Sequence, residues 1–292
     1  MKINNFSKGI LSSSIGSFYW GFIGTIFFQF ISFVGTLEVV IHRCIWTTFF
    51  LLITTTFFNK WNIFFKIIKN KKILIILFFT GILIFGNWSL WIYAVATNRI
   101  IDASIGYFIF PIISVLFGYI FLKEKLKNKR IISILLVVIS LVYLLVVFNE
   151  IPWIGLSVAI MWSLYNLIRK KINIDADIGL LIESIFLLPI VVIIFNYLSI
   201  NNSIDFSLSD PKLMFLLFLA GPMTVIPLFL FIKGVEYSGL GPSGMTFFIT
   251  PTGQFLLGFF YYNEPFSLEK FLSFILIWIA VFIYLKDLYE KY

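Results

Sequence analysis

The chain has few charged residues, one cysteine and one histidine. Only 12% of its 292 residues are Asp, Glu, Lys or Arg, about half the usual share of a soluble globular domain. The single cysteine, Cys44, excludes an intramolecular disulfide and a CxxC metal site. No HExxH, GxSxG or Cys/His zinc pattern occurs, and GILIFGN at 81–87 lacks the Lys and Ser or Thr of a phosphate-binding loop. The sequence therefore predicts no enzyme chemistry, no metal and no other cofactor.

Apolar residues, in contrast, are abundant. They make up 60% of the chain, and the mean hydropathy is +1.01. A soluble domain of this length could not bury so much apolar surface, whereas a membrane helix needs about 20 mainly apolar residues. Helices are the expected solution, because backbone groups in hydrocarbon must bond within their own segment and no period-2 alternation suggests a barrel. The predicted fold is an all-α membrane protein with ten transmembrane helices, at 9–29, 37–58, 73–97, 101–122, 131–148, 151–171, 178–197, 212–235, 240–262 and 267–285.

Lysine and arginine lie in short blocks between the apolar runs rather than in one patch. Eighteen of the 22 fall at the chain ends or in alternate loops and the helix ends beside them, including 169–171 at the end of the sixth helix. Three others, Arg99, Lys212 and Lys270, fall on the opposite side, and Arg43 lies inside a helix. Because positive residues mark the cytoplasmic side, both termini are predicted to be cytoplasmic. The same distribution accounts for the net charge of +8 without nucleic acid as a partner.

The chain repeats itself at an offset of 140 residues. The segments IGYFIFPIISVLFGYIFLKEK at 105–125 and MTFFITPTGQFLLGFFYYNEP at 245–265 share six identities, and Trp20 and Trp162 form a weaker echo in the first helix of each half. Each half, 1–148 and 149–292, holds five helices, so the second copy must be inverted. Inverted repeats are typical of transporters whose halves rock around a midplane site. The matched residues with distinctive chemistry are Pro111 with Pro251, Gly118 with Gly258, and Glu124 with Glu264.

Ionisable residues inside a predicted helix are costly and usually face a cavity. Glu38 and His42 are four residues apart and share a helix face, whereas Arg43 points about 100° away. Glu183 matches Arg43 in the repeat, but helix directions leave a vertical gap of about 10 Å at a rise of 1.5 Å per residue, so a direct ion pair is disfavoured.

These residues carry the site hypothesis. Arg43 is predicted to contact an anionic group of a solute, with snorkelling to the outer surface as the alternative. Glu183 is predicted to carry a coupling proton, with snorkelling to the inner surface as its alternative. His42 is either a second proton carrier or a packed, hydrogen-bonded residue.

Four polar or aromatic residues in the third and fourth helices complete the predicted binding set. Asn87 is deep enough in the membrane to need hydrogen-bond partners. Trp88 and Trp91 are three apart, far from a helix end, and fit core packing as well as cavity lining. Tyr107 follows Gly106 near the start of the fourth helix. The predicted substrate-binding residues are Arg43, His42, Asn87, Trp88, Trp91, Tyr107 and Glu183.

Several longer strings resemble a known family. They are HRCIW at 42–46, GNWSLWIYAV at 86–95, ASIGYFIFP at 103–111, FLKEKL at 121–126, RKKI at 169–172 and LIESIFLLP at 181–189. With ten helices in two inverted halves, they resemble the EamA branch of the drug/metabolite transporter superfamily, and its RarD-type chloramphenicol-sensitivity proteins in particular. The resemblance covers nearly the whole chain. It implies a secondary transporter of the inner membrane and leaves the solute undefined.

The leading functional hypothesis is a secondary transporter for a small metabolite or drug-like solute, working by alternating access and driven by protons or by the solute gradient. A membrane assembly or scaffold protein without transport is the main alternative, and a membrane enzyme is the third. The inverted repeat favours transport, because a scaffold has no need of two-fold symmetry. The expected partners are a small-molecule solute, with proton coupling as one option, and the lipid bilayer. The oligomeric state is left open, with a dimer as one option.

Overall fold

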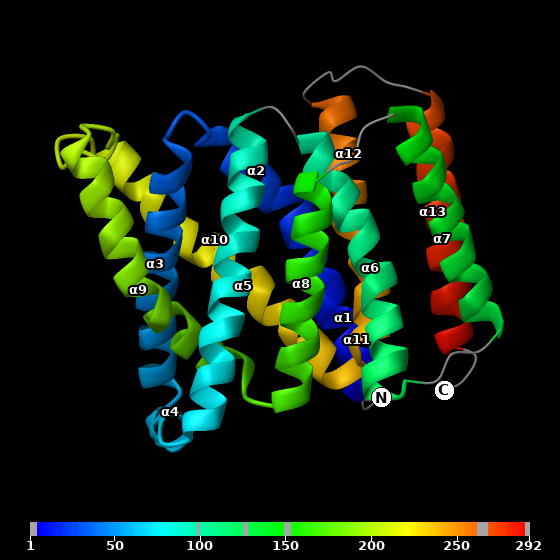
Figure 1. Cartoon of the computed structure of the whole chain (residues 1–292), viewed down its shortest axis with the longest axis horizontal. Helices are drawn as coiled ribbons and strands as arrows, with labels where there is room; N and C mark the ends of the chain where they lie inside the picture. Colours follow the sequence, from blue (N-terminus) through cyan, green and yellow to red (C-terminus); the bar gives the residue numbers. More distant parts are fainter. Residues whose placement is uncertain (1–4, 98–99, 125–127, 149–152, 262–267, 290–292) are drawn as a thin grey trace.

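The computed structural model describes residues 5–97, 100–124, 128–148, 153–261 and 268–289 and is helical in every ordered element of these ranges (Figure 1). Arg99 and Glu264 lie outside the described residues. The elements are α1 (Asn5–Phe18), the π-helical η1 (Tyr19–Gly24), α2 (Thr25–Phe30), α3 (Thr36–Phe57), α4 (Trp61–Ile68), α5 (Lys71–Ala96), α6 (Ile100–Leu122), α7 (Asn128–Phe148), α8 (Trp153–Ile172), α9 (Ala176–Ile200), α10 (Pro211–Ser238), α11 (Leu240–Thr246), α12 (Ile249–Phe260) and α13 (Leu268–Tyr289).

Five helical stretches in the described part of the chain are long and apolar enough to cross a membrane. They are Asn5–Phe30, Thr36–Phe57, Lys71–Ala96, Ala176–Ile200 and Pro211–Ser238, with 22 to 28 residues each. At a rise of 1.5 Å per residue, even 20 residues reach about 30 Å, the thickness of the hydrocarbon core. The helices α6, α7, α8 and α13 contain 23, 21, 20 and 22 residues. The fold is thus that of an all-α, multi-pass membrane protein.

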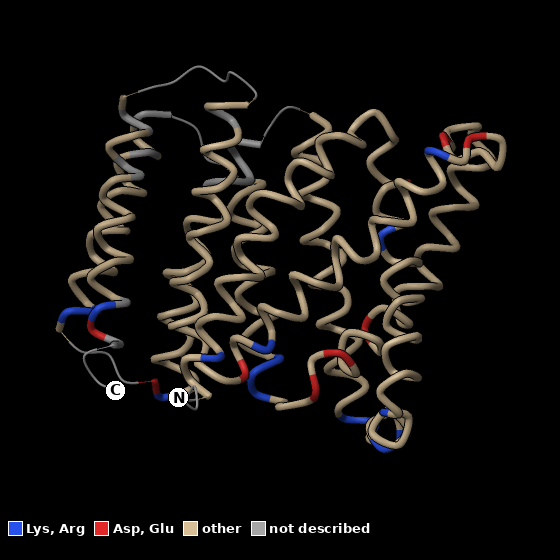
Figure 2. The backbone as a smooth tube through the Cα atoms, turned by 180° about the vertical axis from the view of Figure 1, so that it is seen from behind, with Lys and Arg blue, Asp and Glu red and all other residues tan. Residues whose placement is uncertain are grey.

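The helices form one bundle in which segments distant in sequence are neighbours. α3 and α9 pack at one edge, α7 and α13 pair at the other, and α10 crosses the bundle obliquely (Figure 1). α1 packs mainly against α10, and α5 and α6 both pack against α8. Lys and Arg gather at the end of the bundle where both chain ends are marked, while the α9–α10 loop carries charges at the other end (Figure 2).

The first predicted helix, 9–29, contains an unexpected π-helical segment. Gly21 of η1 approaches α12 closely, because a Cβ there would lie 2.8 Å from the Thr250 carbonyl oxygen. The hydroxyl of Thr25 donates to the Trp20 carbonyl oxygen at 3.0 Å, which gives the widened turn a hydrogen-bond partner. Such π-bulges often occur at functional sites, and apolar periodicity does not distinguish them from α-helix.

The expectation of one continuous helix over 240–262 is wrong. A turn at Phe247 and Phe248 separates α11 from α12. Pro251 has no N–H to donate, and the Phe247 carbonyl accepts instead from the Thr250 amide at 2.9 Å. Pro111, its counterpart in the repeat, stays inside the continuous α6. The predicted loop between the second and third helices also contains a short helix, α4.

Candidate functional site

Arg43 of α3 is the buried positive charge around which the first cluster forms. The side chain is 1% exposed, and its Nε donates to Thr224 Oγ1 of α10 at 2.8 Å. Thr224 in turn donates to the Ala220 carbonyl oxygen at 2.8 Å, so its hydroxyl proton is committed and a lone pair faces Arg43. The guanidinium carbon lies 4.8 Å from the ring centre of Phe28 and 4.5 Å from that of Trp88. These rings stabilise the cation through their negative faces.

Tyr107 of α6 is buried and interacts electrostatically with Arg43. Trp91 lies edge-on to Phe28, with 5.5 Å between ring centres. The structure therefore brings together four predicted site residues, Arg43, Trp88, Trp91 and Tyr107. Together with Phe28 and Thr224 they form what we call the Arg43 centre.

Asn87 and His42 lie near this centre but serve other contacts. Asn87 donates to the Val158 carbonyl oxygen of α8 at 3.1 Å, which supplies the partner that its depth requires. His42 is buried beside Glu38, with 3.9 Å between His42 Nε2 and Glu38 Oε1, as their four-residue spacing predicts. Its ring packs against Phe206 of the α9–α10 loop at 5.1 Å. His42 thus faces the end of the bundle that carries this loop.

Glu183 of α9 occupies a second buried cluster. Its Oε1 accepts from Thr80 Oγ1 at 2.6 Å, and its Oε2 accepts from Tyr165 Oη at 3.0 Å. Arg169 forms an ion pair with it at 3.7 Å, and the two side chains are 2% and 1% exposed. We call these four residues the Glu183 centre. Glu183 pairs with Arg169 and not with Arg43, as the predicted vertical gap requires.

Aromatic rings connect the two centres. Tyr107 packs on Phe247 at 5.5 Å, and Phe247 lies 6.2 Å from Trp162. Trp162 stacks on Tyr165 at 5.3 Å with 10° between the ring planes, and Tyr165 bonds Glu183. The rings come from α6, the α11–α12 turn and α8. Packed aromatic rings therefore run from the Arg43 centre to the Glu183 centre.

The sequence analysis counts Arg169 only among the basic residues at the cytoplasmic end of the helix over 151–171 and does not include it in the predicted site. Arg169 lies in the last turn of α8, is 3% exposed, and its Nη2 donates to the Ala176 carbonyl oxygen at 3.1 Å. The RKKI string offered no distinction among its three charges, because the next two residues are basic as well. Thr224 and Thr80 were also missed, since a threonine inside an apolar run carries no signal of its own.

Two hollows lie beside these clusters. One of about 420 Å³ lies between α3 and α10 and reaches Lys60 and Asp177. The rest of its lining is Leu51 and Thr54 of α3, Phe58 directly after α3, and Val225, Ile226, Phe229 and Leu230 of α10. Since Arg43 and Thr224 precede these residues on the same two helices, the hollow lies between the Arg43 centre and the lysine-rich end.

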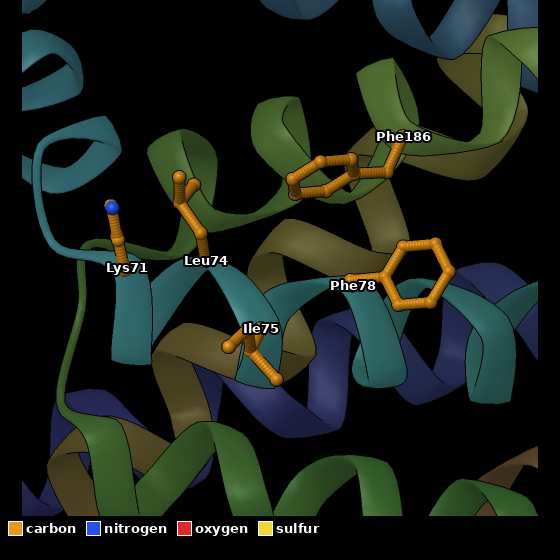
Figure 3. Close-up of a pocket in the computed structure, with 5 residues that line it drawn as sticks. All are labelled: Lys71, Leu74, Ile75, Phe78 and Phe186. Atoms are coloured by element: carbon orange, nitrogen blue, oxygen red, sulfur yellow. The ribbon is translucent and has the colours of Figure 1, made fainter.

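The other hollow, about 390 Å³, lies between α5 and α9 (Figure 3). Lys71 stands at one end, and the rest of the lining is apolar: Leu74, Ile75, Phe78 and Phe186. Ile75 and Phe78 are exposed on the outside of the bundle, so this surface suits lipid chains. No group of His, Cys, Asp and Glu in the described residues is placed to hold a metal ion.

Comparison with known proteins shows to which family the chain belongs. The model described as "EamA-like transporter family" matches residues 7–146. "Protein RarD" of Salmonella typhi is 32% identical over 280 residues, which is 96% of this chain and 95% of that protein. This chain belongs to the EamA-like transporter family. The resemblance inferred from the strings around Arg43, Trp88 and Glu183 is thereby confirmed.

Other EamA relatives are equally full-length. "Protein RarD" of Escherichia coli (strain K12) is 31% identical over 96% of this chain and 94% of its own length. "Uncharacterized transporter YojE" of Bacillus subtilis (strain 168) is 31% identical, covering 95% of this chain and 93% of that protein. A crystal structure with 12% identity superposes at a TM-score of 0.69 over 95% of this chain and 97% of its own, which shows the shared fold.

Membership bears directly on function class. The EamA and RarD proteins are transporters and not enzymes, so the chain is a transporter-family, multi-pass membrane protein. The lack of enzyme motifs in the sequence agrees with that assignment.

Proposed function

We propose that this EamA protein is a secondary transporter that moves a small metabolite or drug-like solute across the inner membrane by alternating access. Its two halves, 1–148 and 149–292, act as inverted five-helix repeats, and the solute is recognised where they meet. The observation that carries the proposal is the Arg43 centre, because it joins a buried, incompletely bonded cation of the first half to Thr224 of the second.

Contacts between counterpart residues support the inverted repeat. Phe108 and Phe248, matched at an offset of 140, lie 6.1 Å apart between ring centres. Trp20 and Trp162, the weaker echo, lie edge-to-face at 5.5 Å. In a two-fold arrangement, residues on the axis contact their own counterparts, and both pairs fit that expectation.

The helix neighbours support it as well. Suppose that α8 repeats α1–α2, α9 repeats α3, α10 repeats α5, α11–α12 repeat α6, and α13 repeats α7. The packing of α1 on α10 then corresponds to the packing of α8 on α5. In the same way, α3 on α10 corresponds to α9 on α5, and α6 on α8 corresponds to α12 on η1; all these pairs are in contact. α3 and α9 run in opposite directions, as do α5 and α10 (Figure 1). Opposite directions of counterpart helices are what an inverted repeat requires.

The proposed orientation has both termini in the cytoplasm. It rests on the gathering of Lys and Arg at the end of the bundle where the chain begins and ends (Figure 2). The hollow that reaches Lys60 and Asp177 would then open on the cytoplasmic side.

Glu183 is the proposed proton carrier. It is a buried carboxylate with three partners, Thr80, Tyr165 and Arg169, whose bonds favour the charged form. A change of conformation that withdraws Arg169 would leave the Glu183 carboxyl group without its cation in an apolar environment, where the neutral form is favoured. Proton exchange would then accompany the change of side.

The test is solute movement by purified protein in liposomes, screened against a metabolite library with and without a proton gradient. Uptake or efflux of a solute by the wild type, lost in Arg43→Ala and retained in Lys69→Gln, supports the proposal; Lys69 is exposed and serves as the matched control. No movement of any solute by a correctly folded protein would favour the scaffold alternative.

Coupling is tested in the same vesicles. Glu183→Gln should lose gradient-driven accumulation and retain passive exchange, because the amide keeps the shape but cannot carry the proton. Accumulation that survives in Glu183→Gln and fails in His42→Gln would transfer the role to His42. If neither substitution matters, the protein is a facilitator without proton coupling.

A further inference from the structure

The Arg43 centre holds hydrogen-bond donors without acceptors. Nη2 of Arg43 and Nε1 of Trp88 are both buried and have no partner among the described residues. The side chains are 1% and 2% exposed, so water does not compensate freely. No described carboxylate forms an ion pair with Arg43, in contrast to Arg169 in the Glu183 centre. A buried, unpaired arginine is costly, and its missing partner must carry negative charge and accept hydrogen bonds.

The guanidinium is held in one orientation. Nε is bonded to Thr224 Oγ1, which is itself fixed by the Ala220 carbonyl oxygen. The rings of Phe28 and Trp88 lie over the guanidinium, so an incoming group approaches most easily at the Nη edge, in the plane. A planar fork of N–H donors matches a carboxylate in bidentate geometry.

We propose that the solute of this transporter is an organic monocarboxylate with an apolar or aromatic body, bound through its carboxylate to Arg43 Nη2 and Trp88 Nε1. This deepens the proposed function and rests on it. A monoanion is favoured because the Arg43 centre, as described, has one cation, and a dianion such as a phosphate ester would remain half uncompensated. The apolar body follows from the surrounding rings of Phe28, Trp91 and Tyr107.

Binding to the full-length protein in detergent tests this, with tryptophan fluorescence as the readout because Trp88 lies in the site. The probes are benzoate, phenylacetate and hexanoate, with benzamide as the neutral analogue and phenyl phosphate as the dianion. Saturable binding of at least one carboxylate, and weaker binding of benzamide and phenyl phosphate, is expected. The carboxylate dissociation constant should rise about 10- to 150-fold in Arg43→Gln, the range for lost hydrogen bonds to a charged group.

Two further variants separate orientation from folding. Thr224→Val removes the acceptor for Nε and should weaken carboxylate binding, whereas Thr224→Ser keeps the hydroxyl and should restore it. Lys69→Gln, an exposed charge change, should leave binding unchanged. Monodisperse wild-type-like elution of each variant guards against misfolding, and Arg43→Lys, which keeps the charge but not the fork, should bind more weakly than wild type.

The outcomes are distinct. Equal binding of benzamide and benzoate, carboxylate binding unchanged in Arg43→Gln, or no saturable binding of any carboxylate at millimolar concentration would overturn the inference. In liposomes, movement of neutral or cationic solutes but of none of these carboxylates would overturn it and leave the transporter function standing. Carboxylate binding that depends on Arg43, without movement of any solute, would support the site and refute transport.

Discussion

At the scale of single residues, Arg169 can lie inside the bundle because residue 179 has no side chain. A Cβ on Gly179 would overlap Arg169 Nη1. The guanidinium there is buried, pairs with Glu183 and bonds the Ala176 carbonyl, so it has little freedom to move aside. The Glu183 centre therefore depends on a glycine that faces it from the first turns of the same helix, α9.

Gly179→Ala should destabilise the protein by about 1–3 kcal/mol, the usual cost of overpacking a filled interior. Thermal unfolding in detergent measures it. Gly24→Ala is the matched control, because a Cβ there would be 3.4 Å from Trp20 Cδ1, at ordinary contact distance. Equal melting temperatures for the two variants would mean that Arg169 moves freely and that the Glu183 centre is looser than described.

The Gly and Glu of the sequence repeat acquire a physical meaning in the first half. A Cβ on Gly118 would lie 2.6 Å from Glu124 Oε2, so the glycine leaves room for this carboxylate. Glu124 accepts from the amides of Leu240 and Gly241 at 2.7 and 3.0 Å, where α11 begins. The pair thus joins the end of α6 to the start of α11.

At the scale of elements, the α9–α10 loop is tied to the start of α3. Both carboxylate oxygens of Glu38 accept backbone amides of the loop, from Asp205 and Phe206, at 2.7 Å each. Asp205 returns a bond by accepting from the Gly35 amide at 2.8 Å. Glu38 is fully buried, and His42 packs on Phe206 one turn further. These contacts hold the loop against the start of α3.

Glu38→Ala should release the loop. Hydrogen exchange at the Asp205 and Phe206 amides should accelerate by about 10- to 150-fold, since each loses a bond to a charged acceptor. Exchange followed by mass spectrometry over 201–210 measures it, and Asp210→Ala, which removes the α10 cap at the Leu213 amide, is the control in the same loop. Unchanged exchange at residues 205 and 206 would contradict the contact.

At the other end, Lys60 ties the start of α4 to α9. It contacts Asp177 at 2.6 Å and Asp175 at 3.3 Å. Burial alone would lower the pKa of Lys60, but hydrogen bonds and charges from Asp177 and Asp175 outweigh it and hold the pKa above the ordinary 10.5. The contacts of Lys60 with Asp177 and Asp175 therefore stabilise the folded protein below pH 10.5. That contribution is lost as the pH rises through the raised pKa of Lys60.

The expected result is a melting temperature that falls more steeply above pH 10.5 in wild type than in Lys60→Met. Comparison of the two proteins cancels the tyrosine titrations that they share. Lys66→Met, at an exposed position of α4, should follow the wild-type curve. Parallel curves for wild type and Lys60→Met would show that the ion pair contributes nothing to stability.

At the scale of the whole molecule, the orientation in the membrane is open to a direct test. A single cysteine at Asn201 should react with a membrane-impermeant maleimide added outside, and one at Lys66 should react only after permeabilisation. Both positions are exposed, and the background Cys44→Ala is suitable because Cys44 is free and fully buried. Labelling of the Lys66 site from outside would overturn the proposed topology.

The helical, membrane-spanning class and several of the buried ionisable residues followed from sequence. Hydropathy is a local property, so apolar runs locate the helices within a few residues, as with 37–58 against Thr36–Phe57. The distinctive strings indicated the EamA family, and the cost of charge in hydrocarbon singled out Arg43, His42 and Glu183. The π-helical turn η1 and the helix break at Phe247 were not predicted. They depend on close packing against other helices and on the hydrogen bond that proline cannot donate, and apolar periodicity reports neither.

What only the tertiary structure decided is which partner each buried charge has. Glu183 pairs with Arg169, Arg43 with Thr224, and Glu38 with backbone amides of residues 205 and 206. Hydrogen bonds and ion pairs act over about 3–4 Å, and these partners are 14, 181, 167 and 168 residues apart in the chain. Their meeting depends on how helices cross, which is set by packing across the whole bundle and leaves no mark in the local pattern of residues.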